Sequence, residues 1–226
     1  MIIHDRVSEN SEKCDSTKEL KLIIVDPCFY SREGLIEALR IRTEFEKKWQ
    51  ISHENSLSNL LSIISIRQIK KTIKINTFNF LVINLPPIPT IALSLLLQLR
   101  EFEMSRFDRV TILSDFNNDK ILDIFIRIGG NVNVSIESSK LPASKICDLI
   151  LLANNLDNIK KDITPHNKSL QLSNKECIAL LLMLQGEPVA SSAFKFSISR
   201  KTIYSRRHSG LIKLGETNMK SLLNKL

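Results

Sequence analysis

The chain alternates short apolar runs with longer segments in which apolar residues recur every three or four positions. The runs 21–25, 80–85, 109–113 and 132–136 have the length and β-branched content of buried strands, and 49–52 is a shorter candidate. The periodic segments predict helices over 31–42, 57–70, 90–102, 120–128 and 142–156. Strands that alternate with helices predict a parallel sheet covered by helices on both faces.

The pattern stops near Leu156, where Asn, Lys, Asp and Pro165 gather over the next residues. This composition predicts an interdomain linker. We therefore expect a flexible polar arm at 1–19, an α/β domain at 20–156, a linker at 157–169 and a second domain at 170–226.

The second domain reads as a series of helices. Ser173 and Glu176 form a capping-box pattern before an apolar stripe that ends at Gly186. A short helix is expected from Pro188 to Phe196, followed by a turn at 197–198 and a helix from the N-cap Ser199 to a stop at Gly215. A short helix, a tight turn and a cationic helix predict a helix-turn-helix.

The two faces of this last helix differ. Ile203, Arg206, Gly210 and Leu214 fall on one face at helical spacing. The other face carries cationic, aromatic and hydroxyl side chains and no acid: Lys201, Tyr204, Ser205, His208 and Ile212. That composition suits a helix that reads the major groove of DNA, with a solvated basic helix face as the alternative.

The net charge supports a polyanionic partner. The 226 residues carry a formal charge of +8, and 43% of them are hydrophobic, as is ordinary for folded proteins. From Lys168 onward there are ten Lys and Arg residues against three acids, whereas the remaining 167 residues are nearly neutral. A charge confined to the second domain points to nucleic acid.

Residues 172–226 resemble the four-helix DNA-binding domain of the LuxR/NarL (FixJ) transcription factors, without a gap. The resemblance rests on Leu172-Ser173, Lys175-Glu176, Gln185-Gly186, Ala193, Ile198-Ser199, Lys201-Thr202-Ile203 and Lys213-Leu214-Gly215. Ile178, Phe196 and Arg206 depart from the family pattern. The form of the last helix is most similar to that of the Rcs-type regulators of enteric bacteria.

The resemblance implies roles for single residues. It implies that Tyr204, Ser205 and His208 read bases, while Lys201, Thr202, Arg207 and Lys213 hold phosphates and Arg206 falls toward the inner side. The terminal helix, expected over Thr217–Lys225, would pair two copies on DNA through Met219, Leu222 and Leu223. The implied partners are double-stranded promoter DNA, a second copy or an RcsB-like regulator, and RNA polymerase as a further candidate.

The α/β domain resembles the flavodoxin-like receiver domain of response regulators. Receivers hold Mg²⁺ on paired acids after the first strand, phosphorylate an aspartate that ends the third strand, and pair it with a lysine at the fifth. Here Asp26 remains, but Pro27 takes the second acidic place and Asn84 takes the place of the phosphoacceptor; Ser114 keeps the hydroxyl position. The lysine position falls near Ile136, and Lys140 comes too late. These losses predict a pseudo-receiver without a catalytic residue, metal or cofactor.

Two details follow for this degenerate pocket. Asp26 is expected to be a turn acceptor at a strand end. Phe29 and Tyr30 are expected to fill the vacated space.

The remaining residues indicate a cytoplasmic protein. Of Cys14, Cys28, Cys147 and Cys177, two lie within apolar patterns and none has zinc-ligand spacing, so reduced and buried thiols are expected. Neither a signal peptide nor an apolar stretch long enough to span a bilayer is visible.

Three functions are compared. The sequence favours a DNA-binding transcription regulator that works without phosphorylation. The alternatives are an interaction module that alters a true response regulator with little DNA contact, and an enzyme acting on a phosphorylated ligand. The enzyme is disfavoured because no glycine-rich loop follows the first strand and no nucleophile–base pair is visible.

Overall fold

A computed structural model of the chain describes residues 19–43, 49–54, 77–101, 107–130, 133–152 and 170–226. Its described strands form one parallel sheet in the order β2-β1-β3-β4-β5. They are β1 (Glu19–Val25), β2 (Trp49–Glu54), β3 (Thr77–Asn84), β4 (Arg109–Leu113) and β5 (Asn133–Glu137). This strand order is that of the flavodoxin-like doubly wound folds, so the predicted α/β architecture is confirmed.

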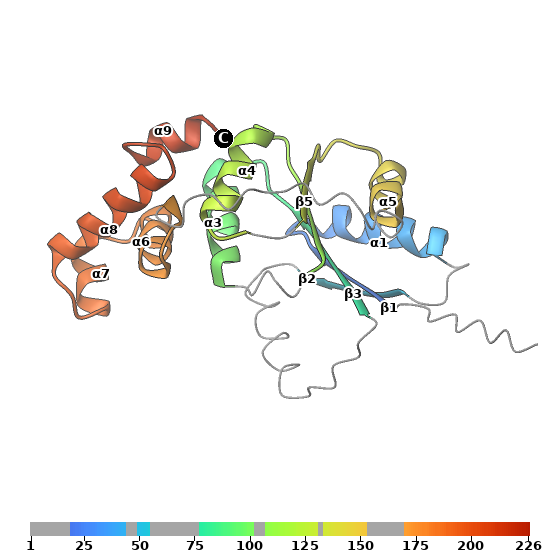
Figure 1. Cartoon of the computed structure of the whole chain (residues 1–226), viewed down its shortest axis with the longest axis horizontal. Helices are drawn as coiled ribbons and strands as arrows, with labels where there is room; N and C mark the ends of the chain where they lie inside the picture. Colours follow the sequence, from blue (N-terminus) through green and yellow to red (C-terminus); the bar gives the residue numbers. More distant parts are fainter. Residues whose placement is uncertain (1–18, 44–48, 55–76, 102–106, 131–132, 153–169) are drawn as a thin grey trace, which may run out of the picture.

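Helices cover both faces of the sheet (Figure 1). On one face, α1 (Phe29–Thr43) and α5 (Ala143–Leu152) enclose an apolar cluster with the inward side chains of the strands. On the other face lie α3 (Pro89–Gln98), a 3-10 turn η1 (Leu99–Glu101) and α4 (Asn118–Arg127). Both clusters bury β-strand residues completely, which explains the unbroken apolar runs of the sequence.

The expected element boundaries shift by a few residues at several places. The first strand starts at Glu19, inside the expected arm, and α1 begins at Phe29. The helix expected over 90–102 ends at Gln98 and continues as the 3-10 turn. The helix expected over 57–70, the linker 157–169 and residues 1–18 lie outside the described residues.

Four helices follow in residues 170–226: α6 (Asn174–Leu184), α7 (Val189–Lys195), α8 (Arg200–Lys213) and α9 (Met219–Asn224). The capping box of Ser173 and Glu176 forms as predicted. Gly215 follows α8 with a φ of +77°, a left-handed conformation that favours glycine and ends the helix.

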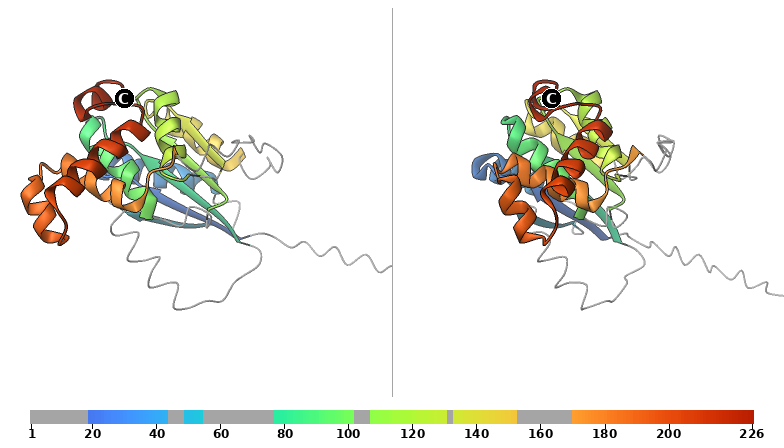
Figure 2. Two further views of the ribbon diagram at one scale, coloured as in Figure 1. Left: turned by 60° about the vertical axis from the view of Figure 1, so that its left-hand side comes forward. Right: turned by 90° about the vertical axis from the view of Figure 1, so that its left-hand side faces the viewer.

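These helices pack directly on the α/β part (Figure 1). α6 and α9 contact α3, and one apolar cluster runs without a break from Ile124 of α4 to Leu180 of α6 and Leu222 of α9. Main-chain hydrogen bonds cross the same boundary, from Leu172 N to Arg127 O and from Asn117 N to Leu226 O. α7 and the first turns of α8 project away from the sheet (Figure 2).

No helix in the described part of the chain combines the length and the apolar character that a membrane crossing requires.

Candidate functional site

Helix α8 is fixed at its start and along its inner face. The Ser199 side chain accepts a hydrogen bond from Thr202 N at 3.0 Å, which satisfies a free amide of the first turn. Ile203 and Leu214 are buried on the inner face. Gly210 lies where a Cβ atom would come within 2.9 Å of Leu180 Cδ1, so its missing side chain permits the close approach of α8 to α6.

A buried carboxylate fixes α8 relative to α6. Glu176 accepts hydrogen bonds from Ser209 Oγ at 2.6 Å, from Lys213 Nζ at 2.9 Å and from Ser173 N at 2.7 Å. Burial alone would raise the pKa of Glu176, but the hydrogen bonds from Lys213, Ser209 and Ser173 outweigh it and lower that pKa to about 2. Glu176 therefore stays ionised at neutral pH and holds both helices together.

The outer face of α8 is open. Lys201, Ser205, His208 and Ile212 are exposed, and Tyr204 exposes 62% of its surface. The helix contains five Lys and Arg residues and no acid. The two faces therefore lie as the sequence predicted. The role of these side chains in DNA contact stays a prediction.

Two residues that were expected to hold phosphates point elsewhere. The Lys213 ammonium donates to Gln171 O at 3.0 Å as well as to Glu176, and Arg207 Nη2 donates to Glu187 O at 2.8 Å. The reason is helical geometry, because Arg207 follows Ile203 by one turn and lies only about 40° from it around the axis. Both residues hold the domain together in this arrangement, and their expected contacts with phosphates stay a prediction.

Of the α8 residues expected to contact DNA, Thr202 and Arg206 are also half-buried. The Thr202 hydroxyl pairs with Ser199 Oγ at 2.8 Å within the N-cap, and Arg206 is partly covered, as its inward position implied.

The sequence did not predict Arg200 or Phe194 as candidate residues of the DNA-binding face. Arg200 is the first residue of α8 and is exposed beside the turn, where the charge next to the N-cap could have signalled it. Phe194 of α7 is 90% exposed and borders an open depression next to Arg200. Nothing in the apolar periodicity of such a short helix indicated that Phe194 points outward.

The apolar face of α9 is covered within the chain. Leu222 is fully buried, and Met219, Leu223 and Leu226 pack against the cluster shared with α3 and α4. The side chains expected to pair two copies are therefore occupied by intramolecular contacts in this structure.

The pocket that the sequence predicts to be a degenerate receiver pocket lies at the carboxyl ends of β1 and β3. Asp26 is 3% exposed; its Oδ1 accepts from Cys28 N at 2.8 Å, and its Oδ2 accepts from Asn84 Nδ2 at 2.8 Å. The first contact is the turn-acceptor role expected of Asp26. Ser114 is buried, and its hydroxyl accepts from Phe116 N at 3.0 Å. In the described part of the chain no three His, Cys, Asp or Glu residues are grouped as a metal would require.

The edge of the pocket differs from expectation at Phe29 and Tyr30. Phe29 and Tyr30 were expected to fill it, but both are exposed and stack edge-to-face on each other, so that prediction was wrong. They begin α1 on its outward side, and Pro27, Leu85, Pro86 and Pro87 form the apolar wall in their place. Lys140 reaches Asp115 at 3.3 Å, although it follows the end of β5.

The expectation of reduced and buried thiols is met by two of the cysteines. Cys147 and Cys177 are buried and free, Cys28 is free but exposed, and Cys14 lies outside the described residues.

No protein-family model matches the chain, and no curated protein sequence matches it. Solved structures similar to it include RcsB from Salmonella enterica serovar Typhimurium bound to the promoter rprA in the presence of phosphomimetic BeF3− (21% identity, 91% of this chain, 97% of that chain, TM-score 0.45). An RcsB–DNA complex (19%, 92%, 98%, 0.48) and the response regulator StyR (16%, 91%, 97%, 0.38) are also similar. These values are too low to transfer a function, which is therefore argued from the residues of this chain.

Proposed function

We propose that this protein is a DNA-binding transcription regulator that inserts α8 into the major groove and works without phosphorylation. The observation that carries the proposal is the exposed outer face of α8, which bears cations and hydrogen-bonding side chains and no acid. A helix held rigidly from behind by Glu176 and capped at Ser199 is preorganised for such insertion.

The side chains divide by chemistry. Lys201 and Arg200, at the exposed start of the helix, supply charge for phosphate oxygens, with Arg206 and Thr202 at the flank. Tyr204, Ser205 and His208 are the base readers. Ser205 and His208 offer donors and acceptors, and the Tyr204 ring suits apolar contact with a thymine methyl group.

The pocket supports independence from phosphorylation. Asn84 stands at the phosphoacceptor place, where its neutral amide offers no carboxylate oxygen to attack a phosphoryl group, and its Nδ2 donates to Asp26. Pro27 removes an oxygen ligand that Mg²⁺ would need.

We propose double-stranded promoter DNA as the partner, bound by a homodimer or by a heterodimer with an RcsB-like regulator; RNA polymerase is a further candidate. Pairing through Met219, Leu222 and Leu223 requires α9 to leave α3 first, because its apolar face is covered. An interaction module with little DNA contact is less well supported, since it does not explain the open cationic face of α8.

The proposal is tested by selecting duplexes from a random-sequence pool with the full chain. We expect an enriched motif, bound more tightly than its scrambled version in fluorescence anisotropy. A variant with Lys201→Ala and Arg200→Ala should recover far less DNA, whereas Lys220→Ala, an exposed lysine of α9, should behave like the wild type. A pool that shows no enrichment and no retention of duplex would refute a DNA-binding function.

A further inference from the structure

The degenerate receiver pocket is a defined cavity of about 390 Å³ with a polar end and an apolar wall. Its volume falls in the range of small-ligand sites. The chemistry of its described lining indicates which class of ligand the pocket would bind. Such a ligand is separate from the DNA of the proposed function.

The polar end presents acceptors. Among the described residues, the two Asp26 oxygens accept only from neutral donors, Cys28 N and Asn84 Nδ2. Asn84 Oδ1 is buried, with no hydrogen-bond partner among the described residues. A buried carboxylate that has only neutral donors and a buried carbonyl that has none are both costly. A ligand that supplies a positive charge and N–H groups would satisfy both.

The neighbouring cations do not reach the Asp26 carboxylate. Arg32 Nη1 donates to the main-chain oxygen of Asp26 at 2.9 Å rather than to its carboxylate. Arg32 Nε is buried without a hydrogen-bond partner among the described residues and lies 3.7 Å from Glu33 Oε1. Lys140 pairs with Asp115 and is exposed. In the described part of the chain, the charge of Asp26 therefore has no cation of its own.

The apolar wall of the pocket favours a ligand with a carbon chain over a bare ion. Pro27, Leu85, Pro86 and Pro87 offer hydrocarbon to whatever lies beside Asp26 and Asn84. A metal ion would leave this surface unused, and the described residues supply no metal-ligand grouping. A primary ammonium group carries three donors and a positive charge, and an attached carbon chain would cover the apolar wall.

We propose that this pocket binds a small primary amine in its protonated form. The ammonium group donates to the Asp26 carboxylate and to Asn84 Oδ1, and the carbon chain packs on the three prolines and Leu85. The pocket thus recognises an organic cation at the position where receiver domains carry an anionic phosphoryl group.

The test measures thermal unfolding of the full chain with n-butylammonium chloride, with n-butanol and with sodium chloride at matched concentrations. We expect a saturable rise in Tm with n-butylammonium alone, because only this probe combines the charge with the carbon chain. Asp26→Asn should weaken the apparent affinity about tenfold or more, since it removes a charge-assisted hydrogen bond. Glu37→Gln, at an exposed acid of α1, is the matched control and should bind like the wild type.

Asn84→Leu is the second variant, which keeps Asp26 and removes the free carbonyl; it should also lose affinity even if Asp26→Asn fails to fold. Three results would overturn the proposal. They are equal stabilisation by n-butanol, no saturable effect of n-butylammonium on the wild type, and undiminished affinity in a folded Asp26→Asn or Asn84→Leu protein. A saturable effect of MgCl₂ that Asp26→Asn abolishes would assign the pocket to a metal instead.

Discussion

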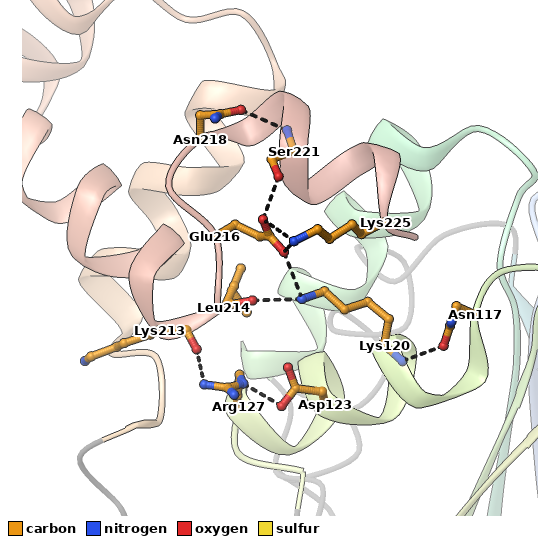
Figure 3. A network of polar contacts seen from close by, with 10 residues as sticks. All are labelled: Asn117, Lys120, Asp123, Arg127, Lys213, Leu214, Glu216, Asn218, Ser221 and Lys225. Carbon is orange, nitrogen blue, oxygen red and sulfur yellow. Dashed lines mark hydrogen bonds and ion pairs between the residues drawn. The ribbon is translucent and has the colours of Figure 1, made fainter.

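The ammonium group of Lys120 on α4 donates a hydrogen bond to the main-chain carbonyl of Leu214, 2.9 Å away at the end of α8 (Figure 3). The same group lies 3.6 Å from Glu216, and Arg127, two turns further along α4, donates to Lys213 O. Helix α4 thus supplies donors to the carbonyls that α8 leaves free at its C-terminus. The α/β part and the helix with the open cationic face are held as one unit.

Replacing Lys120 with Met should lower the free energy of unfolding by about 1–3 kcal/mol, because the Leu214 carbonyl loses a donor in a partly buried place. Denaturant titration of the full chain measures this change. Lys140→Met is the control, since that lysine pairs with Asp115 on the surface, and its effect should be close to zero. Equal effects of the two changes would show that the Lys120 contact does not hold in solution.

Leu222→Ala should destabilise the protein by about 2–5 kcal/mol, because it empties a place in the shared apolar cluster. Leu223→Ala, at a partly buried neighbour, should cost less. Denaturant unfolding measures both. If both changes leave stability unaltered but abolish paired binding to DNA, then α9 lies at an intermolecular interface and not against α3.

The positions of these two side chains illustrate what the sequence could predict. Apolar periodicity placed Leu222 and Met219 on one face of a helix, yet it cannot say whether a second copy or α3 covers that face. The sheet was predictable because buried parallel strands leave continuous apolar runs, as in β3 and β4. Contacts between segments far apart in the chain, such as Lys120 with Leu214, leave no local signal.

The candidate site shows the same division. Helical spacing predicted the outer face of α8 and the N-cap at Ser199, because both are properties of one continuous segment. The inward turn of Lys213 depends on Glu176, which sits on another helix and was recognised only as a capping residue. The exposure of Phe29 and Tyr30 was mispredicted because the geometry of the strand-to-helix turn decides it.

Stability should fall in acid in a way that Glu176 partly controls. Its pKa lies near 4.5 when unperturbed and at about 2 in the folded chain, so its ionised form stabilises the fold above pH 4.5. This contribution, on the order of 3 kcal/mol, is lost as the pH falls from about 4.5 toward about 2. Denaturant unfolding across that range should show a shallower pH dependence for Glu176→Gln than for the wild type. Identical slopes would mean that the contacts of Glu176 with Lys213 and Ser209 do not persist in solution.

Acetyl phosphate or beryllofluoride with Mg²⁺ should change neither the oligomeric state nor the DNA affinity, since Asn84 offers no carboxylate to modify. Sedimentation and anisotropy with and without the phosphodonor measure both. A Mg²⁺-dependent shift in either property would contradict independence from phosphorylation.

We propose that the outer face of α8 reads DNA. The decisive measurement is the binding of Tyr204→Ala and Lys201→Ala to a selected duplex and to its scrambled version across a salt series. We expect Tyr204→Ala to lose about 1–3 kcal/mol on the selected duplex and little on the scrambled one. Lys201→Ala should weaken both duplexes alike and reduce the salt slope by about one. An equal loss of affinity of Tyr204→Ala for both duplexes, or unaltered binding in both variants, would show that this face does not read DNA.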